Sequence, residues 1–170
     1  GNRDFDEHEG YRYAQDIQKA LDNNDTKSWL IYRTYERRTN GIAHACVYVN
    51  IKGKKTTDRY EFEQGYTVGK ENKTVIIKQL YATTYKTGVY NTPRTKDNAM
   101  YVHQYPDQPT LGFRYLLIYS DYKNGDILRV LDRNSGVECE LYVHEAAVEN
   151  GNFSDCEGMY EYACGSDDRR

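Results

Sequence analysis

Three strand-like segments follow one another between residues 113 and 143, and their spacing restricts this part of the chain to an antiparallel β fold. Each segment is rich in β-branched or aromatic residues, and turn residues separate it from the next. The segments are residues 113–119, 126–131 and 137–143, and the turns are Asn124-Gly125 and Asn134-Ser135-Gly136. Asn-Gly favours a hairpin turn in which both central residues take positive φ. We therefore expect two successive hairpins here.

Two carboxylates in these hairpins are candidates for a binding site. Strand side chains alternate between the two faces of a sheet, so Asp126 shares a face with Leu128, and Glu140 shares one with Tyr142. Because their strands are adjacent, Asp126 and Glu140 can point into the same space. The alternative is that Asp126 only caps the preceding turn and that Glu140 faces solvent. Spacing alone favours this alternative slightly.

The rest of the chain extends the β pattern between two helical ends. Apolar residues at helical spacing predict a short amphipathic helix over residues 8–23, and residues 156–164 suit a short helix or coil. Further strands are expected at residues 28–36, 42–51, 57–64, 66–68, 74–85 and 99–104. We expect a single all-β domain spanning residues 1–170. It would be an eight-stranded antiparallel up-and-down barrel, with both helices packed outside and room inside for one small ligand.

The net charge and the cysteines limit the class of partner and the compartment in which the protein is expected. The net charge is −3 with scattered basic residues, which argues against nucleic-acid binding, and no apolar run approaches the roughly 18 residues of a membrane span. Four cysteines without metal-like spacing suggest two disulfides, whose connectivity stays open among three possibilities. Three glycosylation sequons begin at Asn24, Asn72 and Asn152. Together these features favour a secreted protein whose leader has been removed over a cytosolic one.

Catalytic motifs are weak. Residues 65–70 (GYTVGK) fall one residue short of a phosphate-binding loop, and the four histidines form no zinc pattern. A carboxylate pair could serve a glycosidase, but a small barrel offers no extended sugar cleft. We therefore expect a binding protein with no enzymatic activity, cofactor or metal. Two carboxylates inside a narrow barrel are costly without a partner, and a ligand with an ammonium group would supply one.

The sequence also resembles a known family, the salivary lipocalins of ticks, and among these the members that bind biogenic amines. The resemblance rests on the run of residues 118–121 (IYSD), then Asp126-Ile127-Leu128, then Glu140-Leu141-Tyr142 followed by Cys156. Cys46, Cys164 and Thr34-Tyr35 agree with it as well. It implies that Asp126 and Glu140 hold the ammonium, that Tyr142 and Phe113 pack on the ligand ring, and that Tyr35 lines the barrel. A further acid is expected near the helix, at Asp25 rather than Asp22.

One departure concerns the cysteines. The family has a cysteine just before the acidic residue, where this chain has Gly125, and this chain instead has Cys139 just before Glu140. The resemblance then implies a relocated pair, Cys139 with Cys156, beside the retained pair of Cys46 with Cys164. No match to the family's second acidic site is found near residues 71–73, so one ligand site is expected.

The resemblance implies a monomeric, secreted scavenger in tick saliva that binds histamine or serotonin and so counteracts inflammation. Two rival functions remain. A lipid mediator such as a leukotriene or thromboxane would need a basic residue in the lumen, and an inward Arg33 without an acidic partner would favour it. Alternatively, the barrel is a scaffold whose outer loops bind a host protein such as a complement component, and a collapsed interior would favour that.

Overall fold

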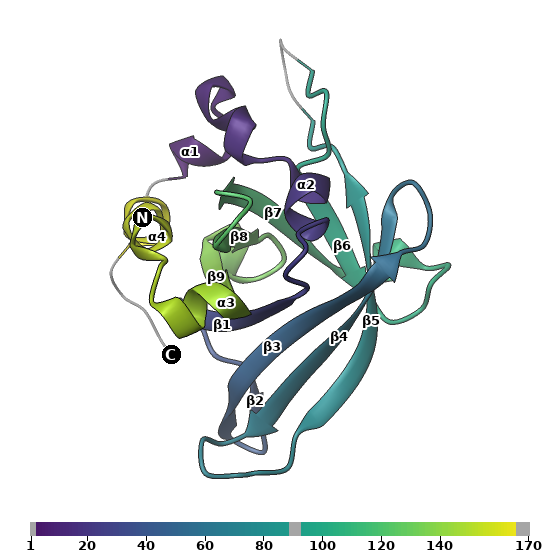
Figure 1. The fold of residues 1–170 in the computed structure, drawn as a ribbon. Helices are drawn as coiled ribbons and strands as arrows, with labels where there is room; N and C mark the ends of the chain where they lie inside the picture. Colours follow the sequence, from purple (N-terminus) through teal and green to yellow (C-terminus); the bar gives the residue numbers. More distant parts are fainter. Residues whose placement is uncertain (1–2, 89–92, 166–170) are drawn as a thin grey trace.

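The computed structural model describes residues 3–88 and 93–165, and its centre is a closed barrel (Figure 1). From β3 to β9 each strand pairs antiparallel with the next, and β1 pairs with both β9 and β3, which closes a barrel of eight strands in the described chain. The two-residue β2 only extends the edge of β3. The strands are β1 Lys27–Arg33, β2 Arg38–Thr39, β3 Ile42–Lys54, β4 Arg59–Val68, β5 Ile76–Tyr85, β6 Ala99–His103, β7 Phe113–Ser120, β8 Gly125–Val130 and β9 Glu138–His144. The expected lipocalin barrel is confirmed.

The N-terminal helix is shorter than expected. In place of one helix over residues 8–23, the chain forms α1 Asp4–Glu7, the 3-10 helix η1 Glu9–Ala14 and α2 Ile17–Leu21. The interruption falls at Gln15, whose side-chain amide donates to the carbonyl oxygens of Phe5 and Ile118. Asp16 then caps α2 by accepting from the Lys19 N–H. These hydrogen bonds of Gln15 therefore interrupt the single helix that the periodicity predicts.

Helices also follow the last strand. They are α3 Glu145–Asn150 and α4 Ser154–Cys164, and two further 3-10 turns are η2 Pro109–Leu111 and η3 Asn134–Gly136. No described helix is long and apolar enough to span a membrane.

The turn before β8 differs from the expected Asn-Gly hairpin. Positive φ occurs at Tyr122 (60°) and at neither Asn124 nor Gly125. The Asp121 carboxylate accepts hydrogen bonds from the backbone N–H groups of residues 123, 124 and 125 and so holds the turn. The turn is thus capped by Asp121, which leaves the Asp126 side chain available to the interior.

The barrel wall separates two apolar cores. The inner core lies within the barrel and includes Tyr60, Phe62 and Leu117, with Ile17 and Ala20 of α2 packed against them. The outer core lies between strands β7–β9 and the terminal helices, and it includes Phe5 and Tyr160. Figure 1 shows α4 in yellow lying against the outside of the barrel. Residues that alternate along β7–β9 therefore divide between the two cores.

The disulfide pairing differs from the expected one. Cys139 faces outward, as its alternation with Glu140 requires, but it bonds to Cys164, while Cys46 and Cys156 are free. Cys156 and Cys164 lie eight residues apart on α4, which is about 12 Å along a helix. Cys139 can therefore reach only one of them. The predicted pairs of Cys139 with Cys156 and of Cys46 with Cys164 are both wrong.

Candidate functional site

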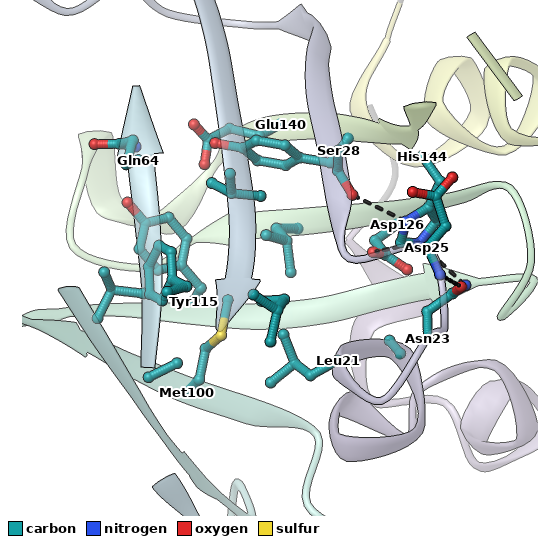
Figure 2. Close-up of a pocket in the computed structure, with 18 residues that line it drawn as sticks. Leu21, Asn23, Asp25, Ser28, Gln64, Met100, Tyr115, Asp126, Glu140 and His144 are labelled. Carbon is teal, nitrogen blue, oxygen red and sulfur yellow. Dashed lines mark hydrogen bonds and ion pairs between the residues drawn. The ribbon is translucent and has the colours of Figure 1, made fainter. Parts of the chain in front are cut away.

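A cavity of about 80 Å³ lies inside the barrel, and both candidate carboxylates line it. We call it the inner cavity. Its walls are mostly apolar and come from α2 and from strands around the barrel; they include Leu21, Val49, Ile51, Phe62, Met100 and Leu128. Figure 2 shows Asp126 and Asp25 grouped with His144 at one end, and Glu140 with Gln64 and Tyr115 at the other. The carboxylates of Asp126 and Glu140 lie on the same face of the sheet but at opposite ends of the cavity.

The end that holds Asp126 and Asp25 is called the acidic end. Asp126 accepts a hydrogen bond from Ser120 Oγ at 2.7 Å, and its Oδ2 lies 3.7 Å from His144 Nε2. Asp25 comes from the segment between α2 and β1 and accepts from the backbone N–H of Ala146 at 3.0 Å. By contrast, Asp22 does not line the inner cavity and bonds to the Tyr60 hydroxyl. Of the two alternatives for the further acid, the structure places Asp25 in the cavity.

His144 is held in place by two polar side chains. Its Nδ1 lies 3.0 Å from Ser28 Oγ, and its Nε2 lies 3.3 Å from Asn23 Nδ2. The Ser28 hydroxyl and the Asn23 amide therefore fix the orientation of the imidazole, whose Nε2 also faces Asp126.

Burial sets the titration of Asp126. The side chain is 17% exposed, and its desolvation raises the pKa of the carboxyl, which the neighbouring Asp121 carboxylate raises further. His144 and the Ser120 hydroxyl act in the opposite direction and only partly offset this rise. The acidic end therefore holds a buried carboxyl group whose charged form would be stabilised by a positively charged partner.

The opposite end is called the arginine end, and its single carboxylate has several cationic neighbours. Glu140 is 5% exposed and accepts a hydrogen bond from the Tyr35 hydroxyl at 2.7 Å. Burial raises the pKa of Glu140, while the Tyr35 hydrogen bond and the charges of Arg37, Arg33 and Arg133 act to lower it. A cationic ligand would compete there with three guanidinium groups.

The remaining expected site residues are not all brought together. Tyr142 lines the inner cavity beside Glu140, as the strand alternation requires. Tyr35 is buried but lines a smaller recess behind Glu140. Phe113 is 52% exposed, because it is the first residue of β7 and lies at the rim of the barrel, and it does not line the inner cavity. The expected aromatic contact from Phe113 is therefore not supplied in this cavity.

Three polar residues of the acidic end were not predicted as site residues from the sequence, and these are Asn23, Ser28 and His144. One signal was available, because Glu140, Tyr142 and His144 alternate on one face of β9. Ser28 then follows from the register, since it pairs directly with His144 across β1 and β9. Asn23 lies in a loop and carries no comparable signal.

The comparisons with known proteins agree with this barrel. No curated protein sequence matches the chain. The solved structure of AM182 in complex with serotonin is similar, with a TM-score of 0.61 at 18% identity over 89% of this chain and 84% of that one. Japanin from Rhipicephalus appendiculatus, bound to cholesterol, gives 0.54 at 14% identity over 86% and 91%. The cockroach allergen Per a 4 gives 0.53 at 12% identity over 91% and 85%.

At these identities the solved structures establish the fold alone. The sequence model of the tick histamine-binding protein family goes further, because it matches residues 5–170, nearly the whole chain. The chain therefore belongs to the tick histamine-binding protein family.

Proposed function

We propose that this protein is a non-enzymatic scavenger that binds a biogenic amine, histamine or serotonin, in the inner cavity. The ammonium group would lie at the acidic end, between the carboxylates of Asp25 and Asp126. The observation that carries the proposal is the charge balance there. Two carboxylates line the cavity at this end, and no lysine or arginine is among the residues that line it.

An ammonium group would suit the two carboxylates of the acidic end for two reasons. It would offset the cost of keeping a charged Asp126 in a poorly hydrated site, and its three N–H donors could reach carboxylate oxygens on both acids. Family membership and the serotonin complex of the similar protein AM182 support an amine as the ligand.

The ring of the amine would lie along the apolar wall, beside Phe62 and Tyr142. The hydroxyl of serotonin, or the ring nitrogen of histamine that lies farthest from the ammonium, would then point toward Glu140 and Gln64 at the arginine end. This assigns Glu140 a different role from the one expected. Because Glu140 lies at the far end of the cavity from Asp126, we propose that it accepts a hydrogen bond from the ring substituent and that the ammonium belongs to the two aspartates.

A lipid mediator with a carboxylate is the second candidate, and one observation favours it. Arg33 is 5% exposed, and its guanidinium forms no ion pair with a carboxylate in the described part of the chain. A long apolar tail anchored at Arg33, however, would run through the inner cavity toward Asp25 and Asp126. There it would exclude water without providing any partner for their charge, so we prefer the amine.

We further propose that the protein is secreted into tick saliva and acts there as a monomer, removing host amines that drive inflammation and vasoconstriction. The Cys139–Cys164 disulfide supports an oxidising compartment. The sequon residues Asn24, Asn72 and Asn152 are all exposed, which suits glycosylation of a secreted protein.

Calorimetric titration of histamine and serotonin at neutral pH tests the amine site. We expect submicromolar binding by the wild type and at least a tenfold loss (about 1.4 kcal/mol) in Asp126→Asn. The matched control is Asp132→Asn, because this carboxylate pairs with Arg114 and does not line the cavity. Failure of the wild type to bind either amine would refute the proposed function, and tight binding that is indifferent to Asp126 would refute the site.

A further inference from the structure

The arginine end carries more positive charge than the amine function uses. Arg33, Arg37 and Arg133 all act on the one carboxylate of Glu140. Within residues 3–88 and 93–165, none of these three guanidinium groups has a carboxylate oxygen within 4.0 Å. Arg37 instead donates to the Tyr115 hydroxyl at 3.1 Å, and Arg133 donates to a backbone carbonyl. The local balance is therefore cationic.

One donor at this end has no acceptor. Arg33 is buried, and one of its terminal nitrogens donates to the His44 carbonyl oxygen at 2.6 Å. Its Nε has no hydrogen-bond partner among the described residues. Arg33, Arg37 and His44 line a recess of about 20 Å³, which holds little more than one water-sized group. Leaving a buried guanidinium donor unpaired is costly, and an anionic oxygen that entered the recess would satisfy it.

The recess adjoins a larger cavity of about 270 Å³ at the rim of the barrel, which we call the outer cavity; Arg37 and His44 line both. Its walls are rich in rings and poor in aliphatic side chains. The imidazole of His44 stacks on Tyr66 at 4.1 Å between ring centres, and the Arg37 guanidinium lies 5.4 Å from the centre of the Phe113 ring. Lys78 adds a further cation to this wall. These features suit a flat ring that carries a negative charge.

We propose that the recess and the outer cavity form a second binding site, specific for a small aromatic carboxylate. The carboxylate would lie against Arg33 and Arg37, and its ring would lie beside Tyr66 and Phe113. Glu140 lines both cavities and carries the opposing charge, but the Tyr35 hydroxyl already donates to it, and one carboxylate does not balance the three guanidinium groups of Arg33, Arg37 and Arg133. In addition, the pKa of His44 is lowered by burial and by the charges of Lys78, Arg33 and Arg37, which agrees with a cationic end.

Two probes that share one ring test this site. Indole-3-acetate and tryptamine both carry an indole, but their side chains end in opposite charges. Each is titrated by calorimetry into the wild type, Arg37→Gln, Lys78→Gln and the control Arg114→Gln, whose arginine is exposed and pairs with Asp132 outside both cavities. We expect indole-3-acetate to bind the wild type and the control with equal affinity. Its affinity should fall about tenfold in Arg37→Gln and about threefold in Lys78→Gln.

Lys78 is exposed, so Lys78→Gln keeps the test decisive if Arg37→Gln does not fold. If the wild type binds tryptamine but gives no heat with indole-3-acetate, the second site is refuted and the amine site is retained. Indole-3-acetate binding that Arg37→Gln or Lys78→Gln leaves unchanged would also overturn it. Tryptamine binding that weakens as much as indole-3-acetate binding in these variants would show one shared site and would likewise count against the inference.

Discussion

The two ends of the barrel interior hold the same chemical group in opposite surroundings. Asp126 and Glu140 are both carboxylates on inward faces of neighbouring strands, and burial raises the pKa of each. Asp126 has one imidazole at 3.7 Å and a second aspartate lining the same end. Glu140 has a phenol hydroxyl and three guanidinium groups. An inward carboxylate is therefore a candidate cation site only where the neighbouring strands leave its charge unbalanced.

Removing both charges of the acidic end should give the largest effect. In the double variant Asp25→Asn/Asp126→Asn we expect serotonin affinity to fall at least 100-fold, about 2.7 kcal/mol, because no carboxylate is left at the acidic end to bind the ammonium. Calorimetry measures the loss, and indole-3-acetate serves as the control because its site lies at the arginine end. An equal loss of both ligands would mean that the two ends do not act independently.

Acidification should weaken amine binding at a higher pH than an ordinary aspartate would allow. The pKa of Asp126 is raised by burial, so its carboxylate begins to take up a proton above the range typical of exposed aspartates. We expect serotonin affinity to fall about tenfold between pH 7 and pH 5, measured by titration in buffers of matched ionic strength. A flat profile over this range would contradict an ammonium site at Asp126.

Glu140→Gln should change the two ligands in opposite directions. Serotonin should lose about threefold in affinity, since an amide is a weaker acceptor for its ring hydroxyl than a carboxylate. Indole-3-acetate should gain about threefold, because the amide removes the remaining negative charge beside Arg33 and Arg37. Parallel titrations of the two ligands measure both changes in affinity. A change of the same sign for both ligands would contradict the electrostatic difference between the two ends.

Asp126→Asn should stabilise the ligand-free protein at neutral pH. The folded-state pKa of Asp126 is raised, so the stability contributed by its protonated form is present below the unfolded-state pKa and is lost as pH rises through the folded-state pKa. An uncharged asparagine avoids this loss. We expect Tm at pH 7 to rise by about 2–4 °C in a thermal melt, and the difference from wild type to shrink at pH 4. A lower Tm at pH 7 would mean that His144 already balances the charge.

Gly125→Cys should restore a disulfide next to the acidic end with little effect on binding. A Cβ at residue 125 would lie 3.0 Å from Cys156 Sγ and 3.5 Å from Cys156 Cβ, which suits a disulfide. It would also lie 2.9 Å from the Tyr142 carbonyl oxygen, so the strand must shift slightly. Thiol titration under denaturing conditions should show one free thiol in place of two, with serotonin affinity within twofold of wild type. Two or more remaining thiols would show that Cys156 does not face this position.

Parts of the fold could be predicted because they depend on local pattern. Strands β1 and β3 to β9 follow from alternation and turn residues, except that the two segments expected at residues 57–64 and 66–68 form the single strand β4. The turn at residues 134–136 takes positive φ at Asn134, Ser135 and Gly136. The N-terminal helix was overestimated, because its periodicity is local whereas Gln15 bonds to a strand about 100 residues away. The disulfide could not be predicted either, since either cysteine of α4 suits a partner on the barrel wall until the helix is placed.

The sequence by itself determined which residues share a strand face with Asp126 and with Glu140, because side-chain alternation is a property of the strand backbone and needs no other part of the chain. It left open whether that face is the inner one. Only the tertiary structure decided what each carboxylate can bind. That depends on which charges the fold brings beside it, and they come from distant segments: Asp25 and His144 at one end, and Arg33 and Arg37 at the other. Electrostatic balance in a buried site is a sum over spatial neighbours, and the order of residues along one strand does not contain it.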